Sequence, residues 1–480
     1  MMNCKMCRPF VILACFALLT VGCRKENFFD GIDAKLRFST DTLHFDTIFT
    51  TIGSATRSFK IYNPYNQAIL ISSIQLAGGE SSIFRMNVDG IPANELFDVE
   101  IPANDSLYVF VEVTINPNDA SLPYVVEDSI FFTTNGNLQK VILDSWGQNA
   151  NFIDNVIVTG TEVWTNELPY VIYNFFGVDT LSTLTIMEGC KIYVHGDAQF
   201  VVLGTLEVLG TADSNVIFQA DRTEDFYKDV PGQWNGISFL RTSKNNIIRY
   251  ATIKNAINGL LVGYQGTDTT TAFYNDVSTR PQLTLENVQV YDCQQSAMLA
   301  VNAEVDATNC LIYNTGESNV ALTAGGKYNF TYCTLGNYGS AYLTPQGASL
   351  VLTDFFILPF GNNTVAIQNV DEANFTNCIS YGSAAEGKDF VISNDGGAAF
   401  NYSFTKCFLR TDTSLTDFDD CWINIDPEFA NIGDRNYCPD TISQAINAGI
   451  DVSGIIDDLV GTLRPQGSAP DVGCYETYVE

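Results

Sequence analysis

The chain has 480 residues, with 55 acidic and 24 basic side chains and a formal net charge of −31. So acidic a surface repels phosphate and argues against nucleic acid as a partner. Aromatic residues make up 12% of the chain. Together with frequent Thr, Val and Ile and the lack of helical heptads, they favour an all-β fold.

Residues 1–22 have the pattern of a secretory signal peptide. Lys5 and Arg8 precede an apolar run over 9–19 that is too short to cross a bilayer comfortably. The following Thr-Val-Gly-Cys resembles a bacterial lipobox, in which Cys23 is lipidated and becomes the first mature residue. The resemblance implies a lipid anchor in a Gram-negative outer membrane, a surface-exposed position there, and a tether over 23–36. The alternative is a soluble exported protein with an incidental cysteine.

Residues 37–149 read as about seven short strands separated by turn residues. Alternating apolar and polar residues, as in SLYVFVEVTI, indicate antiparallel strands buried on one face. We expect a β-sandwich, and the pattern resembles the Ig-like domains found ahead of bacterial surface modules. His44 lies between Leu43 and Phe45 and is expected to be a strand residue rather than a ligand.

A repeat of about 22 residues dominates the rest of the chain. We expect one buried residue of each repeat, called the zero position, at Ala251, Val288, Cys310, Cys333, Phe355, Cys378 and Cys407. The residues three places before the zero position are apolar, and most of those two places after it are apolar as well. Such a period with short β-runs predicts a solenoid whose coils stack about 4.8 Å apart. Asn287, Asn309 and Asn377 share a turn column, where each amide could bond the Asn above it.

The recurring cysteines are expected to pack in the core, because buried cysteine behaves as a small hydrophobe. Thirteen cysteines less Cys4, Cys7, Cys15 and Cys23 leave nine, and none has zinc-site spacing. A disulfide between neighbours such as Cys310 and Cys333 is the alternative, although parallel Cβ vectors would aim the sulfurs badly.

The runs LTIMEGCKIYVHGDAQFVVLGTLEVLGT (184–211) and NNIIRYATIKNAINGLLV (245–262) resemble right-handed parallel β-helix, pectin-lyase-like envelope proteins. The closing strings IDPEF and APDVGCYE resemble the end of many such proteins. The resemblance implies a right-handed parallel β-helix with a C-terminal cap over 150–480. It leaves function open, since this fold hosts lyases, hydrolases, adhesins and scaffolds.

Catalytic groups are hard to place in the sequence. A lyase needs an Arg or Lys base, usually with Ca²⁺, and a hydrolase needs clustered carboxylates. Arg249 and Lys254 share a coil, but the acids Asp229 and Glu286 are not expected to stack with them. His195 is expected to be a strand-end residue. No catalytic residue, metal ligand or cofactor is therefore predicted, with calcium considered only if the protein acts on carbohydrate.

A non-catalytic surface protein that binds a glycan or another envelope component is the favoured function. A polysaccharide lyase or glycoside hydrolase of the same fold is the alternative, and a passive spacer a third. The longest interruption of the repeat, GYQGTDTTTAFYNDVSTR (263–280), predicts a binding loop with Tyr264, Phe273 and Tyr274, because aromatic rings stack on sugar faces. The alternative is a solvated loop whose aromatic rings anchor it to the rest of the protein and bind no ligand.

One outward column turns apolar in the late coils, at Phe356, Ile379 and Phe408. Such a stripe needs a cover. We expect residues 451–465 to provide it as a short helix with Ile455, Ile456, Leu459 and Val460 on one face.

Overall fold

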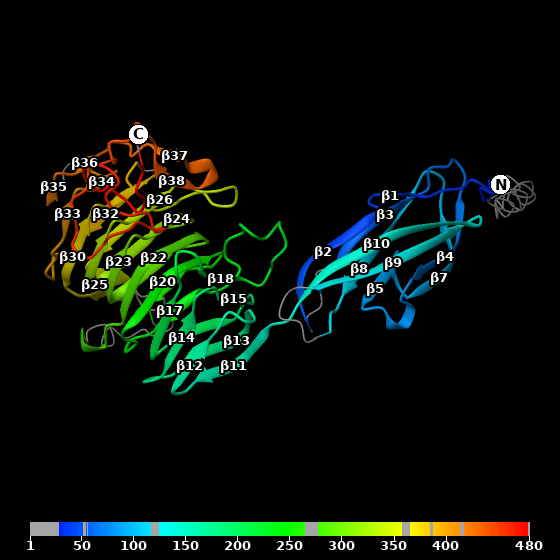
Figure 1. The fold of residues 1–480 in the computed structure, drawn as a ribbon, viewed down its shortest axis with the longest axis horizontal. Helices are drawn as coiled ribbons and strands as arrows, with labels where there is room; N and C mark the ends of the chain where they lie inside the picture. Colours follow the sequence, from blue (N-terminus) through cyan, green and yellow to red (C-terminus); the bar gives the residue numbers. More distant parts are fainter. Residues whose placement is uncertain are drawn as a thin grey trace, which may run out of the picture. The chain divides into compact units, whose positions relative to one another are not determined.

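The computed structural model describes residues 28–50, 54, 56–116, 124–264, 277–357, 365–384, 387–412 and 417–478. The chain divides into two compact units, residues 1–149 and 150–480. Both units are built from β-strands (Figure 1), and the described residues add three single-turn 3₁₀ helices: η1 (Gly79–Ser81), η2 (Val277–Thr279) and η3 (Ile432–Asp434). The fold is therefore all-β, as predicted.

The first unit contains two five-stranded sheets. One has the order β1 (Arg37–Phe38), β3 (Arg57–Tyr62), β8 (Ser106–Val113), β5 (Phe84–Val88), β6 (Ile91–Pro92). The other has the order β2 (Thr42–Phe49), β10 (Asn137–Gln148), β9 (Tyr124–Thr134), β4 (Ile69–Leu76), β7 (Glu95–Ile101). Alternate side chains of both sheets, such as Phe59, Val109, Ile71 and Phe132, form one buried core.

The second unit is a parallel solenoid with three faces, formed by one continuous 24-stranded sheet. The first face contains β12 (Thr161–Trp164), β14 (Thr183–Met187), β17 (Thr205–Leu209), the first halves of β20 (Asn246–Lys254) and β22 (Gln282–Cys293), the second halves of β23 (Met298–Thr308) and β25 (Val320–Thr331), β30 (Val370–Thr376), β33 (Ser403–Thr405) and β35 (Phe418–Asp419).

The second face contains the first halves of β11 (Asn151–Val158) and β13 (Tyr170–Val178), β15 (Lys191–Val194), β18 (Val216–Ala220), the second halves of β20 and β22, β24 (Leu311–Thr315), β26 (Thr334–Asn337), β31 (Ile379–Gly382), β34 (Phe408–Leu409) and β36 (Trp422–Ile423). The third face contains the second halves of β11 and β13, β16 (Gln199–Val202), β19 (Ile237–Phe239), β21 (Leu260–Val262), the first halves of β23 and β25, β27 (Leu350–Thr353) and β32 (Phe390–Ser393).

The predicted register is confirmed over most of the solenoid. Ala251 pairs with Val288, and Leu285, Ala307, Phe330, Phe375 and Phe404 follow one another in a buried column. The ring of Phe375 stacks on Phe404 with centroids 4.6 Å apart. Each coil therefore buries its inward side chains against the coils above and below.

The prediction that Phe355 belongs to a separate coil of the solenoid was wrong. Strand β25 pairs directly with β30, so Cys378 lies one coil after Cys333. Phe355 belongs instead to β28 (Phe355–Ile357), which forms an antiparallel hairpin with β29 (Val365–Ile367). Two insertions in one coil add up to about one repeat length and so imitate an extra coil in the sequence.

For the turn column between the first and second faces, the predicted turn conformation of the backbone is confirmed, but the predicted hydrogen bonds between stacked asparagines are not formed. Asn287, Asn309 and Asn377 have φ of +57°, +52° and +54°, the left-handed conformation that Asn tolerates. Their amides do not bond one another. They donate to main-chain oxygens of the C-terminal segment, at Asp458, Asp457 and Ile450 respectively.

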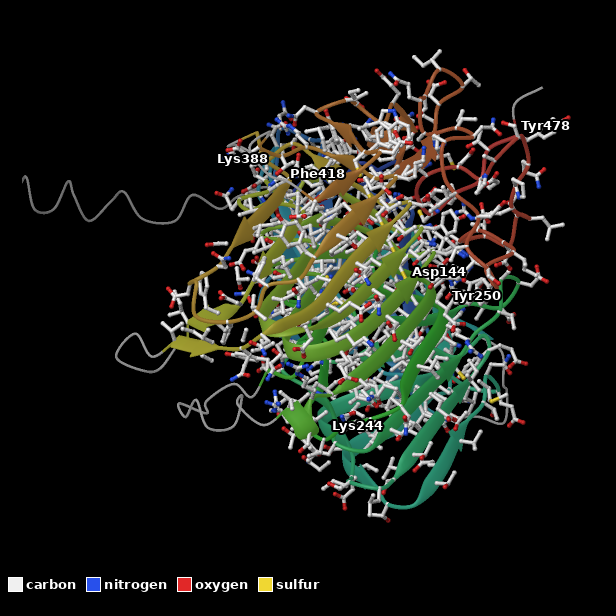
Figure 2. All side chains as sticks on the ribbon, turned by 90° about the vertical axis from the view of Figure 1, so that its left-hand side faces the viewer. Asp144, Lys244, Tyr250, Lys388, Phe418 and Tyr478 are labelled. Carbon is white, nitrogen blue, oxygen red and sulfur yellow. The ribbon has the colours of Figure 1, made fainter. Side chains whose placement is uncertain are left out.

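The C-terminal segment covers the late apolar column, although not as predicted. Residues 451–465 form turns and an isolated bridge instead of a helix, with Gly454 and Gly461 at positive φ. Leu459 packs against Leu311 and Tyr313. Ala445 and Val472 cover Ile379 and Phe408, whereas Phe356 lies elsewhere. Tyr250, which is labelled in Figure 2, also meets this segment. Its hydroxyl lies 3.3 Å from Asp457 Oδ2.

The cysteine column is confirmed as core packing. Cys310, Cys333, Cys378 and Cys407 are buried, carry free thiols and lie in successive coils. Burial raises the pKa of the Cys310 and Cys333 thiols well above the ordinary value, which disfavours the reactive thiolate form. The column ends at Cys421, which is half-exposed.

Candidate functional site

A cleft of about 400 Å³ opens where the second and third faces of the solenoid meet. Four segments distant in sequence line it: the 221–236 loop with Asp229, the end of β24 with Asn314, the 338–349 connection with Ser340 and Tyr342, and the η3 turn. This turn lies between β37 (Phe429–Asn431) and β38 (Asn436–Pro439) and ends at Arg435.

Arg435 is the central side chain of the cleft. One of its terminal nitrogens donates to Asp292 Oδ2 at 2.8 Å, and the other lies 3.1 Å from Asp229 Oδ1. Its guanidinium also lies 5.3 Å from the centre of the Tyr291 ring. Two carboxylates and a ring hold the planar group in one orientation, with the remaining N–H groups left for other acceptors.

A second polar corner column places these groups. Asn255, Asp292 and Asn314 occupy equivalent positions in successive coils, with φ of +64°, +51° and +52°. Just before them lie Lys254, Tyr291 and Tyr313, which pair in register. The short polar residues turn the chain at the corner, and the long side chains before them form the wall on which the C-terminal residues pack.

Tyrosines fill the space behind Arg435. The rings of Tyr291 and Tyr313 stack with centroids 4.7 Å apart, and Tyr437 continues the row at 5.0 Å from Tyr313. The next coil has Gly336 at this position, where a Cβ would lie 2.4 Å from the Tyr437 ring. The Tyr437 hydroxyl lies 3.3 Å from Asn314 Oδ1. The floor of the cleft is thus tightly packed.

Burial shifts the pKa of two groups behind the floor. The carboxyl of Asp292 is fully buried, which raises its pKa to about 6 against the opposing effect of Arg435. Asp292 Oδ1 has no hydrogen-bond partner among the described residues. Burial also lowers the pKa of Lys254, against the opposing effect of Asp229. The site therefore contains a carboxyl and an amine whose charges are costly at neutral pH.

Exposed aromatic rings form the rim. Tyr342 is 47% exposed and Phe226 65% exposed, and their rings meet edge to face with centroids 6.4 Å apart. Tyr227 supports Phe226 at 5.0 Å and carries the Arg222 guanidinium 3.9 Å above its ring. Large exposed rings beside hydrogen-bonding groups are what a ligand with apolar faces and hydroxyl edges requires.

The 221–236 loop is held firmly to the solenoid. The Asn255 amide of the solenoid donates to the Lys228 and Val230 carbonyls of the loop. Within the loop, Gln233 donates to the Tyr227 and Val230 carbonyls, each at 2.7 Å. The side of the rim that this loop forms is therefore preorganised.

Of the predicted binding residues, Tyr264 is half-buried, and its ring packs against Phe356 at 6.0 Å in a small apolar cluster. This contact fits the alternative in which the rings pin the loop. Phe273 and Tyr274, and the predicted lipidation site Cys23, lie outside the described residues.

The expectation that Arg249 has no stacked acid was wrong. Its Nε donates to Glu286 Oε2 at 2.6 Å, because the two residues pair in register on adjacent coils. Both side chains are well exposed, so the pair is a surface ion pair. His195 contacts Asp221 at 2.7 Å and His44 contacts Asp144 at 2.8 Å.

Within the described ranges, no group of three or more His, Cys, Asp and Glu side chains is arranged to hold a metal ion. The same residues include no helix long and apolar enough to cross a membrane.

Sequence reasoning missed the cleft because its residues come from four separate segments. One signal was available: Asn255, Asp292 and Asn314 all lie four places after a zero position, which makes them a second polar ladder. The aromatic rim gave no such signal, because Phe226 and Tyr342 lie in unrelated insertions.

No protein-family model matches the chain, and no curated protein matches it either. Among solved structures, the chain is similar to the pectate lyase Pel9A, with 14% identity, 69% of this chain and 87% of that one covered, and a TM-score of 0.31. It is also similar to the catalytic domain of a GH87 alpha-1,3-glucanase in complex with tetrasaccharides (8% identity, 71% and 91% covered, TM-score 0.14).

A third similarity is to a family 123 glycoside hydrolase from Clostridium perfringens (10% identity, 26% of each chain covered, TM-score 0.17). Scores this low carry no conclusion about activity, and the class assigned to the second unit, a parallel β-solenoid, rests on its strand pairing.

Proposed function

We propose that the protein is a cell-envelope lipoprotein that binds glycan without turning it over, through the cleft around Arg435. The observation that carries this proposal is the combination of the exposed Phe226 and Tyr342 rings with Asp229, Asn314 and Arg435 beneath them. Rings stack on the C–H faces of sugars, while a carboxylate, an amide and a guanidinium match their hydroxyls.

The charged groups of the cleft favour binding over catalysis. Arg435 is already bonded to two carboxylates, and Asp292 is fully buried behind it. Neither is placed as a general base or acid with direct access to a ligand. A solenoid also suits an extended polymer, because its surface repeats along one axis.

The location of the protein is inferred from the sequence. Signal peptide cleavage before Cys23 and its lipidation would attach the chain to the outer membrane, with 23–36 as a tether. We also infer that the two sheets of residues 37–149 form an Ig-like β-sandwich and that the solenoid is right-handed, as β-crossovers are in nearly all proteins.

A glycan array tests this function, run on the mature chain with and without calcium. We expect specific binding without product, and about tenfold weaker binding when Tyr342 and Phe226 are both replaced by Ala. Tyr264→Ala is the matched control, since its ring packs within the protein, and it should bind normally. Equal binding by the double variant and the parent chain would reject the cleft as the site.

A polysaccharide lyase or glycoside hydrolase is the second candidate. It is favoured by Lys254, because burial lowers the pKa of its amine and a lowered pKa makes a neutral amine, which can act as a base, easier to form. Ultraviolet absorbance of an unsaturated product that disappears in Lys254→Met would establish a lyase. New reducing ends without that absorbance would establish a hydrolase.

A further inference from the structure

Strands β3 and β8 are neighbours in one sheet of the first unit (Figure 1), and three aromatic side chains are exposed on the outer face of that sheet. Tyr62, Tyr108 and Phe110 are 37%, 44% and 39% exposed. Strict alternation explains their orientation, because Phe59, Ile61, Val109 and Val111 between them point into the core. Single exposed rings are ordinary, but three on neighbouring strands of one sheet face mark a surface for a ligand or partner.

The three rings form one group with a lysine. Tyr108 and Phe110 lie two positions apart on β8, with their rings nearly parallel and 5.7 Å apart. Lys60 pairs with Tyr108 across the strands, and its ammonium lies 4.6 Å from the centre of that ring. Tyr62 pairs with Ser106 on the same two strands. The group thus offers ring surface and a positive charge at one place.

The charge of this face is opposite to that of the protein as a whole. Its outward-pointing charged residues are three basic and one acidic, Arg37, Lys60, Arg85 and Glu112. The outer face of the other sheet carries Glu95, Glu100, Glu127 and Asp144 with Lys140. Asp89 and Asp105 lie in turns at the ends of the strands. An anion therefore meets complementary charge on this face and repulsion on the other.

We propose that this face is a second binding site, for an acidic polysaccharide such as a polyuronate. The rings of Tyr62, Tyr108 and Phe110 stack on sugar faces, and Lys60 pairs with carboxylates along the polysaccharide. Arg85 adds positive charge to the face, but it lies opposite Glu112 and already donates to the Ser82 and Phe84 carbonyls. The site lies in the first compact unit and is independent of the cleft around Arg435. A second copy of the protein is a poorer occupant, because three rings offer far less than the roughly 800 Å² per partner of a stable dimer.

Native affinity electrophoresis tests the site, using the full mature chain in gels that contain polygalacturonate or neutral dextran. We expect polygalacturonate to retard the protein, dextran to have little effect, and added salt to weaken the retardation. The double variant Tyr108→Ala with Phe110→Ala should bind about tenfold more weakly, and Lys60→Glu should do so as well. Tyr108 and Phe110 are exposed and Lys60 is half-exposed on the same face, so thermal melting should show intact folding.

Two controls separate this proposal from its alternatives. Trp146→Ala with Leu138→Ala removes exposed apolar side chains from the other sheet and should bind within about twofold of the parent chain. The cleft variant Tyr342→Ala should also retain polygalacturonate binding, so failure of the cleft and failure of this face give different results. Undiminished retardation of the Tyr108/Phe110 variant would overturn the proposal.

Three other results would also overturn it. Equal retardation by dextran would show that charge plays no part. Equal retardation by single-stranded DNA that is lost in the same variants would show a general polyanion surface. A parent dimer that becomes a monomer in the Tyr108/Phe110 variant, measured by light scattering, would show that the face joins two protein chains.

Discussion

The guanidinium of Arg464 and the carboxylate of Glu476 lie 2.9 Å apart, and both side chains are almost wholly buried. Arg464 also donates to the Gly473 carbonyl at 2.8 Å, and Glu476 accepts from the main-chain N–H groups of Gln466 and Asp471. This pair closes the C-terminal segment on itself over the second face of the solenoid. It is a structural element that the sequence pattern did not reveal.

Removing one member of this pair should destabilise the second unit strongly. Arg464→Met leaves Glu476 charged and buried without its partner, which costs about 3–5 kcal/mol in the free energy of unfolding. Urea denaturation of the mature chain measures the loss. Arg249→Met is the matched control, because its partner Glu286 is exposed and such pairs contribute about 0–1 kcal/mol. Equal effects of the two substitutions would contradict the importance of burial here.

Asp292 should make stability depend on pH. Its pKa is about 6 in the folded protein and 3.8 in the ordinary exposed state, so the folded protein holds this proton more tightly. The group therefore stabilises the fold below pH 3.8, and the contribution is lost as pH rises through 6. Between pH 5 and 7.5 the free energy of unfolding should fall by about 1.4 kcal/mol from this group alone.

The measurement is the difference between the parent chain and Asp292→Asn, which cannot titrate, at the two pH values. Any constant effect of the substitution cancels in this comparison. Asp306→Asn, at an exposed position on the first face, keeps Asp292, so it should lose stability between pH 5 and 7.5 as the parent chain does. A parent chain that gains stability over Asp292→Asn as pH rises would reverse the expected sign.

Cys23 should carry the membrane anchor. Cys23→Ser removes the thiol to which lipid is attached, so the protein should move from the membrane fraction to the soluble envelope fraction. Immunoblotting of the fractions and the intact mass both report the change. Cys421→Ser, a substitution of the same kind elsewhere in the chain, should leave the fractionation as it was. Unchanged fractionation and mass in Cys23→Ser would reject lipidation.

Thiol titration should distinguish the cysteine column from a disulfide chain. In denaturant without reductant, we expect the nine cysteines from Cys190 to Cys474 all to react as free thiols. In the folded protein, the buried thiols should not react with the titrant. Cys421 should react first, because a hydrogen bond from the Cys407 thiol lowers its pKa, whereas burial raises the pKa of Cys438 to about 11. Fewer than nine thiols in denaturant would show a disulfide.

The solenoid could be predicted because its core repeats. Residues such as Leu285, Ala307 and Phe330 recur at a fixed spacing, and the stacking of coils forces that spacing to be kept. The same reasoning failed at Phe355, because two insertions together matched the repeat length. Periodicity reports how far apart core residues lie, and it cannot distinguish a coil from loops of equal length.

The cleft could not be predicted for a related reason. Asp229, Tyr342 and Arg435 lie in irregular segments whose positions depend on tertiary contacts, such as that between Arg435 and Asp292. Nothing in the local sequence around Arg435 indicates that it crosses to a coil 143 positions away. The wrong prediction of a helix over 451–465 has the same origin, because its carbonyls are bonded to Asn side chains of the solenoid rather than to one another.

The bonds from the turn-column asparagines to the C-terminal segment impose an order on biosynthesis. The hydrogen-bond acceptors of Asn287, Asn309 and Asn377 lie 171, 148 and 73 positions further along the chain, so these bonds can form only after those residues have been made. Coils can stack as they emerge during translation or export. The asparagine amides, however, remain in water until residues 450–458 are made, and the apolar column at Ile379 and Phe408 remains exposed until residues 445–472 are made. A chain interrupted before that point leaves the apolar column exposed to chaperones and proteases, so the C-terminal segment, which is made last, determines whether the coils made before it are retained.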